Sequence, residues 1–149
     1  MMKPTLAGWL LLIFGDLIFL ALMLAQLLMI IRPDSQKTRD ILIGKGKQWR
    51  DHTHFKSAKA FAVADWLLLM PLLILANVGV FIGRSWGYVI LLILGVLSVY
   101  FSIVFWVMER EYTYPSVGAI GYFTYYWGFY LYWGIWVAVY SILKLEILF

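Results

Sequence analysis

The sequence predicts an all-α integral membrane protein whose four transmembrane helices form an up-down-up-down antiparallel bundle, as one transmembrane domain over residues 1–149. Of the 149 residues, 64% are hydrophobic and only 13% are charged. A soluble domain is usually ~45–50% apolar and ~25% charged. The apolar residues also fall into four runs, each long enough to span ~30 Å of hydrocarbon. Most of the surface of such a chain must therefore face lipid.

The first apolar run covers residues 5–31 and ends at Arg32-Pro33, with Asp16 as its one charge. The run exceeds the ~7–15 residues of a signal-peptide core, and no small-residue cleavage site follows it. We therefore expect a retained helix.

The second run covers residues 57–83 and contains Pro71. We expect this proline to kink the helix and not to break it. Neighbouring groups in a membrane bundle can satisfy the carbonyl that the proline leaves free. After a short turn, the third run covers residues 88–108. The fourth run, residues 116–145, follows a polar turn that ends at Pro115, near the first position of the helix.

The basic residues are concentrated in one connection. Eight of the twelve Lys and Arg lie between Arg32 and Lys59. By the positive-inside rule the loop 32–56 is cytoplasmic and both termini lie outside, in what we expect to be a prokaryotic cytoplasmic membrane. The chain lacks the long polar runs of a soluble basic protein, so we expect membrane lipids and no nucleic acid among its partners.

Small and polar residues recur at heptad spacing on each run, which is typical of helix faces that pack against other helices in lipid. On the first two runs these residues are Leu12, Asp16, Phe19, Met23 and Gln26, then Ala58, Ala62, Asp65, Leu69, Leu72, Ala76, Gly79 and Gly83. On the last two they are Gly95, Ser98, Ser102 and Glu109, then Gly118, Gly121, Tyr125, Gly128 and Tyr132. Ordinary bundle packing is the simplest explanation of these stripes.

Asp16 and Asp65 are the leading candidates for chemistry, because a carboxylate in hydrocarbon costs ~2.5–3.5 kcal/mol and normally faces the bundle interior or water. Asp16 lies about eight residues from the outer face and Asp65 about eight from the inner face, roughly 12 Å in each case, so they should not form a dyad. Each acid is either protonated and hydrogen-bonded or ionised in a wet cavity. A proton or ion pathway and a structural hydrogen bond both remain open. Gln26 and Asn77 add polar groups in the inner and outer halves.

The inner face gathers further candidates. Glu109 and Arg110 reach the level of Asp65 from the third run, and Tyr125 and Tyr126 of the aromatic fourth run could wall a vestibule. An aromatic, hydroxyl-lined pocket suits a flat lipophilic ligand such as a quinone, a sterol-like lipid or a tetrapyrrole. Aromatic packing with local hydroxyl bonds is the alternative.

A metal site is a weaker hypothesis. Asp51, His52 and His54 supply the minimum of three ligands, but histidines beside lipid headgroups are commoner. The chain has no cysteine, and no nucleophile elbow, phosphate loop or dinucleotide fingerprint occurs in it. We therefore predict no metal and no cofactor, and no catalytic residue can be named.

Three functions follow, in order of preference. The first is binding or moving a lipophilic or small ligand through a polar vestibule at the cytoplasmic face, with a homo-oligomer sharing the pathway. The second is a non-catalytic accessory or assembly subunit that binds a larger membrane protein. The third is a membrane enzyme acting on a lipid.

Overall fold

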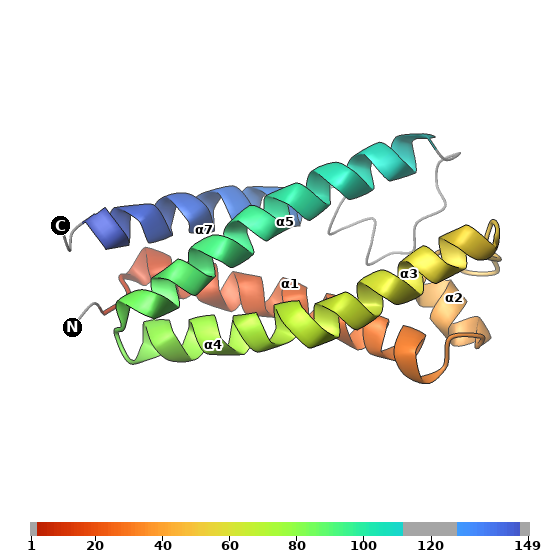
Figure 1. Cartoon of the computed structure of the whole chain (residues 1–149), viewed down its shortest axis with the longest axis horizontal. Helices are drawn as coiled ribbons and strands as arrows, with labels where there is room; N and C mark the ends of the chain where they lie inside the picture. Colours follow the sequence, from red (N-terminus) through yellow and green to blue (C-terminus); the bar gives the residue numbers. More distant parts are fainter. Residues whose placement is uncertain (1–2, 112–127, 147–149) are drawn as a thin grey trace.

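The computed structural model describes residues 3–111 and 128–146, and every regular element in these ranges is a helix (Figure 1). The elements are α1 (Leu6–Ile31), α2 (Gln36–Leu42), α3 (His52–Ala64), the π-helical segment η1 (Asp65–Leu69), α4 (Met70–Phe81), α5 (Ser85–Glu111) and α7 (Phe129–Glu146). Since α3, η1 and α4 follow one another without a gap, they form one helix from His52 to Phe81, called the second long helix here.

Within residues 3–111 and 128–146, three helices are long and apolar enough to cross a membrane: Leu6–Ile31, His52–Phe81 and Ser85–Val107. Their outward faces carry large apolar side chains, such as Leu10, Leu17 and Leu24 of α1, which are all more than half exposed. Lipid is the solvent that suits such faces. The chain is therefore an integral membrane protein, as its composition predicts.

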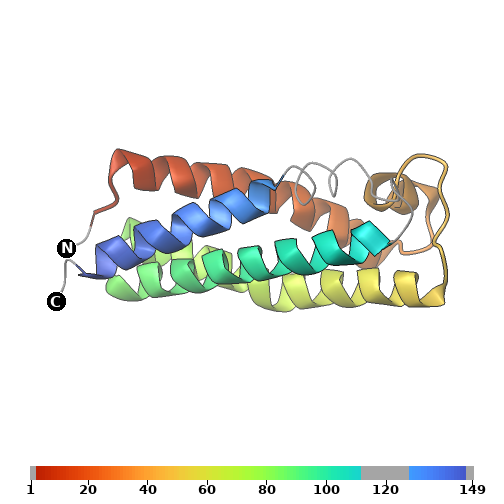
Figure 2. The same cartoon turned by 90° about the horizontal axis from the view of Figure 1, so that it is seen from above.

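The long helices run side by side along one axis (Figures 1 and 2). α1 contacts the second long helix and α7, α4 contacts α5, and α5 packs along α7. Both chain termini lie at one end of the molecule, which we call the terminal end. Helix α2 lies at the opposite end, which we call the basic end because the cluster of Lys and Arg is there.

The second long helix begins at His52, earlier than the apolar run that starts at residue 57. Asp51 is its N-cap: the carboxylate accepts a hydrogen bond from the His54 backbone N–H at 2.8 Å. This cap lets the helix start in polar sequence. α5 is likewise longer than its apolar run, from Ser85 to Glu111.

Pro71 does not break the second long helix, so the predicted continuity at this residue is confirmed. The chain forms the π-helical segment η1 just before the proline, and the Met70 N–H donates to the Asp65 carbonyl, five residues back. A proline ring clashes with the carbonyl four residues earlier in a regular α-helix and offers no N–H to it. A wider π turn at this place accommodates both effects.

The fourth predicted helix does not run unbroken over residues 116–145. Gly128 has φ +74°, a left-handed conformation that a right-handed helix cannot include, and α7 begins only at Phe129. Residues 116–127 lie outside the described ranges.

This break also changes the register of the fourth stripe. The heptad pattern predicts Tyr132 on the packing face, and that prediction is wrong, since Tyr132 is 60% exposed. The buried face of α7 carries Tyr130, Trp133, Val137 and Ser141 instead.

The stripe on the second long helix is largely confirmed: Ala62, Asp65, Leu69, Ala76 and Gly79 are all buried. Glycines allow two close helix contacts. A Cβ on Gly79 of α4 would lie 2.5 Å from the Gly87 Cα of α5. Likewise, a Cβ on Gly134 of α7 would lie 2.6 Å from the Gly95 carbonyl oxygen of α5. Backbone therefore packs against backbone in both helix pairs.

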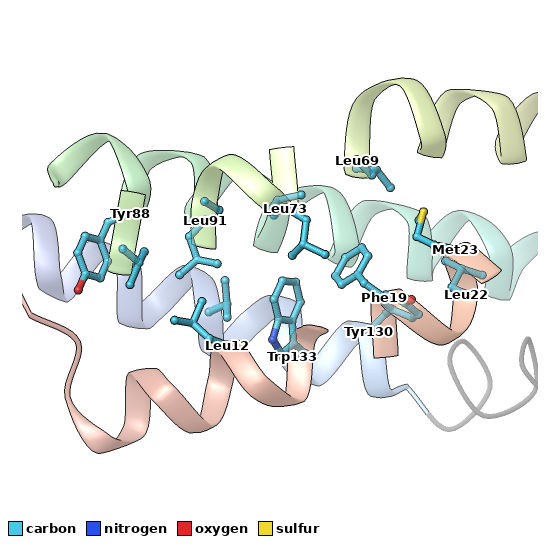
Figure 3. Packing of buried hydrophobic residues seen from close by; sticks show 14 residues of the cluster. Leu12, Phe19, Leu22, Met23, Leu69, Leu73, Tyr88, Leu91, Tyr130 and Trp133 are labelled. Atoms are coloured by element: carbon cyan, nitrogen blue, oxygen red, sulfur yellow. The ribbon is translucent and has the colours of Figure 1, made fainter. Parts of the chain in front are cut away.

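The core lies where α1, α4, α5 and α7 meet (Figure 3). At its centre, the Phe19 ring makes edge contacts with Tyr130 and Trp133, with ring centroids 4.9 Å and 5.1 Å apart. These side chains from α1 and α7 join the two ends of the chain within one core.

Candidate functional site

Two acid–amide hydrogen bonds cross the interface between α1 and the second long helix. The Gln26 side-chain Nε2 donates to Asp65 Oδ2 at 2.5 Å. The Asn77 side-chain Nδ2 donates to Asp16 Oδ1 at 2.7 Å. α1 thus supplies the acid of one pair and the amide of the other.

The two pairs are well separated, as the sequence predicts for the two acids. Asp16 and Gln26 are ten positions apart on α1, roughly 15 Å at helical rise. Phe19 and Met23 lie between Asp16 and Gln26 in the sequence of α1, Leu73 lies between Asp65 and Asn77, and all three belong to the buried apolar cluster (Figure 3). The acids therefore do not form a dyad.

Asp65 is the more enclosed of the two acids. Only 5% of its surface is exposed, whereas Asp16 is half-buried. Gln26 is 6% exposed and lies five residues before the end of α1, roughly 8 Å from it. The Gln26–Asp65 pair is thus a buried polar site in the half of the bundle toward the basic end.

The hydrogen bonding of this pair is incomplete within the described ranges. Gln26 is the one hydrogen-bond donor that those residues give to the Asp65 carboxyl group. The Gln26 carbonyl oxygen Oε1 is buried and has no partner there. A buried acceptor without a donor costs about 1–3 kcal/mol. Either a proton on Asp65 or a donor from a bound molecule would satisfy this oxygen, because a protonated carboxyl group and a primary amide can exchange two hydrogen bonds.

Three aromatic side chains fix α1 by its backbone. Trp133 Nε1 donates to the Leu11 carbonyl at 2.8 Å, and the Tyr130 hydroxyl donates to the Ile18 carbonyl at 2.9 Å. Trp66, next to Asp65, donates to the Met23 carbonyl at 3.1 Å. Buried indole and phenol groups need such partners. Two of these bonds join α1 to α7, and the one from Trp66 joins α1 to the second long helix near the Gln26–Asp65 pair.

The predicted vestibule can be followed only in part. Glu109 and Arg110 belong to the last turn of α5, which points toward the basic end (Figure 1), but their side chains lie outside the described residues. Tyr125 and Tyr126 lie outside the described residues altogether. Asp65 is therefore the one predicted member of the vestibule whose side-chain surroundings are defined.

The three weak metal candidates have other roles. Asp51 caps α3, and the backbone hydrogen bond from His54 lowers the pKa of the Asp51 carboxyl group. The His54 Nδ1 accepts from the Arg50 N–H at 3.5 Å, and the His52 ring stacks on Phe55. In residues 3–111 and 128–146, no group of three or more His, Cys, Asp or Glu could hold a metal ion.

From the sequence, the expected partners of the two acids are hydroxyl groups, such as those of the tyrosines in the fourth run, and not amides. The sequence nevertheless places Gln26 in the inner half with Asp65, and Asn77 in the outer half with Asp16, so membrane depth is the signal that could pair them. Comparison of the chain with protein-family models, curated protein sequences and solved structures finds no match. The chemistry of the Gln26–Asp65 pair must therefore carry the functional argument.

Proposed function

We propose that this chain is a four-helix integral membrane protein that binds a small or lipophilic ligand at the Gln26–Asp65 pair. The fourth span would comprise α7 and the residues before it, and the bundle would run up-down-up-down. The basic end would face the cytoplasm and both termini would lie outside, because the positive-inside rule assigns the Lys- and Arg-rich connection to that side. The common position of both termini at the other end supports this topology.

The observation that carries the proposal is that Gln26 Oε1, beside the buried Asp65, finds no donor among residues 3–111 and 128–146. An ionisable residue inside a membrane span is rare and usually functional, and its function involves its neighbours. Here the neighbour is a neutral amide with a free acceptor. A ligand that carries a hydroxyl or amide N–H could donate to that oxygen, while its apolar part would meet the lipophilic surroundings.

Binding is favoured over movement across the membrane within one chain. A pathway from Asp65 to Asp16 would have to cross the buried apolar cluster between the two acid–amide pairs. Movement would therefore need a route along a subunit boundary of a homo-oligomer. Glu109, Arg110, Tyr125 and Tyr126 remain our proposed mouth of the site at the cytoplasmic face.

Native mass spectrometry of protein gently extracted from its own membrane tests the proposal. Asp65→Asn keeps the size of the side chain and its ability to pair with Gln26, but it also offers an N–H to Oε1 and so competes with the ligand. We expect the wild type to release a small molecule on activation, and Asp65→Asn to lose it.

Asp16→Asn is the matched control, because it makes the same change in the other acid–amide pair. It should retain the molecule. Wild-type protein without any retained molecule, or equal loss from both variants, would contradict a site at Asp65.

A second function, a non-catalytic accessory subunit, is favoured by a different observation. Tyr100 and Tyr132 lie within α5 and α7, and each is 60% exposed. Lipid tails offer no partner for a phenol hydroxyl, whereas a neighbouring membrane protein does. If the double substitution of Tyr100→Phe and Tyr132→Phe leaves every co-purifying protein and the homo-oligomer intact, this alternative is wrong.

A further inference from the structure

The basic connection between α1 and α3 is folded against the end of the bundle. The Thr38 hydroxyl of α2 donates to the Arg32 carbonyl at 2.7 Å, at the end of α1, and Thr38 is fully buried. Asp40 accepts from the Gly46 N–H at 2.9 Å and closes the following turn. The Lys and Arg side chains of this connection are therefore presented by a defined surface.

The carboxyl groups of Asp40 and Asp51 each accept a backbone hydrogen bond. The hydrogen bond from the Gly46 N–H is the largest cause that lowers the pKa of Asp40. The hydrogen bond from the His54 N–H is the largest cause that lowers the pKa of Asp51. The charges of Lys45 and Arg39 are the smallest contributions at Asp40. Both carboxylates therefore count against the cations in the net charge of this connection.

The cations point outward and dominate the charge. Eight Lys and Arg against three Asp give residues 32–59 a net charge of +5, while the whole chain carries +4. Six of the eight side chains are exposed: Arg32, Lys37, Lys45, Lys47, Lys56 and Lys59. We call these six the basic surface.

An aromatic cluster lies beside the basic surface at the start of the second long helix. Trp49 makes edge contacts with Phe55 and His54, with ring centroids 5.5 Å and 5.2 Å apart, at the start of the second long helix. Tryptophan prefers the headgroup layer at the boundary between lipid and water. Lys47, Lys56 and Lys59 are exposed and close to this cluster in the sequence, so a tryptophan in the headgroup layer would bring them near lipid phosphates.

We propose that the basic surface binds the phosphodiester headgroups of anionic phospholipids in the membrane that the chain spans. Juxtamembrane clusters of four to eight Lys and Arg attract anionic lipids, with about a fivefold gain in affinity for each cation. A soluble acidic partner is less favoured, because the surface adjoins helices that hold it permanently beside headgroups. The proposal is independent of the ligand site at Gln26–Asp65.

The test uses the purified full-length chain in neutral detergent, so that membrane orientation does not influence the result. Equal amounts of phosphatidylglycerol and phosphatidylcholine are added, and native mass spectrometry counts the bound lipids. We expect the wild type to retain phosphatidylglycerol at least tenfold more than phosphatidylcholine. Lys45→Gln combined with Lys47→Gln should reduce phosphatidylglycerol affinity about 25-fold.

Lys3→Gln combined with Arg84→Gln is the matched control, since it removes two exposed cations at the terminal end. It should keep wild-type lipid affinity. Equal retention of both lipids, or equal losses from the two double variants, would overturn the proposal. Displacement of phosphatidylglycerol by millimolar inorganic phosphate would overturn it too, since the surface would then bind free anions. So would saturation by a soluble acidic protein from the same cells that leaves no lipid bound.

Discussion

The Gln26 amide donates to the Asp65 carboxylate across the interface of α1 and the second long helix, and the Asn77–Asp16 pair repeats this contact with acid and amide exchanged. Because the helices are antiparallel, both pairs can form in only one register. A slip of either helix by one turn would separate both pairs by ~5.4 Å. The pairs therefore specify the alignment of the two helices, which apolar packing alone defines weakly in lipid.

A double-mutant cycle should detect the coupling of the Gln26–Asp65 pair. Gln26→Leu leaves a buried carboxyl group without its donor, and Asp65→Leu leaves a buried amide, so each single change should lower the free energy of unfolding by about 1–3 kcal/mol. The double variant buries neither group and should be more stable than the sum of the single losses predicts. We expect a coupling of about 0.6–1.7 kcal/mol, the range of intramembrane hydrogen bonds. Unfolding by SDS in mixed micelles measures it.

The Asn77–Asp16 pair serves as the comparison for this cycle. Asp16 is half-buried, so water or lipid headgroups can replace part of its lost hydrogen bond. The coupling between Asn77→Leu and Asp16→Leu should be the smaller one. A coupling of zero in both cycles would show that the pairs do not contribute to stability.

The close approach of α4 and α5 predicts a strong effect of side-chain volume at Gly79. A Cβ there would lie 2.5 Å from the Gly87 Cα, a backbone atom that cannot move without separating the helices. Gly79→Leu should therefore destabilise the fold by more than the 1–3 kcal/mol that is typical of overpacking. Ala64→Leu adds a similar side chain at an exposed position of α3 and should have little effect. Thermal unfolding in detergent compares the two, and equal melting temperatures would contradict this packing.

The sequence predicts the long helices well because lipid imposes a simple requirement: about twenty apolar residues per span. It does not predict Gly128 as a helix boundary, because a left-handed glycine leaves no trace in an apolar pattern. The early start at His52 depends on the side chain of Asp51, which lies outside the apolar run. Ser35 caps the seven-residue helix α2 locally, but its position depends on the contacts of the Thr38 hydroxyl with the Arg32 and Leu28 carbonyls at the end of α1, which no local pattern encodes.

The sequence likewise predicts one part of the candidate site and not the other. The cost of a charge in lipid identifies Asp16 and Asp65 from the sequence alone. The partner of each acid depends on helix register, which follows from contacts between side chains distant in sequence. The sequence suggests hydroxyl partners for both acids, whereas the structure gives the amides of Gln26 and Asn77, whose depth in the membrane is the one property that the sequence links to these acids.

Gly15 should tolerate a side chain only when Trp133 is absent. A Cβ on Gly15 would lie 2.5 Å from the indole ring, so Gly15→Ala must displace the ring and weaken its hydrogen bond to the Leu11 carbonyl. We expect Gly15→Ala to destabilise wild-type protein by about 1–3 kcal/mol. In a Trp133→Leu background, the same change should cost almost nothing, because the clashing ring is gone. Equal costs in both backgrounds would show that the two sites are independent.

The N-cap of α3 should make the start of the second long helix sensitive to acid. The His54 backbone N–H lowers the pKa of Asp51, so the folded carboxyl group binds its proton at lower pH than the unfolded one, whose pKa is about 3.9. The stabilisation is complete above that value and is lost as the pH falls through the folded pKa. Amide hydrogen exchange of the first turn of α3, corrected for intrinsic rates, should therefore show falling protection below about pH 4. Asp51→Ser keeps a capping oxygen that does not titrate, and its protection should stay constant over this range. If wild type and Asp51→Ser lose protection together, another group controls this turn.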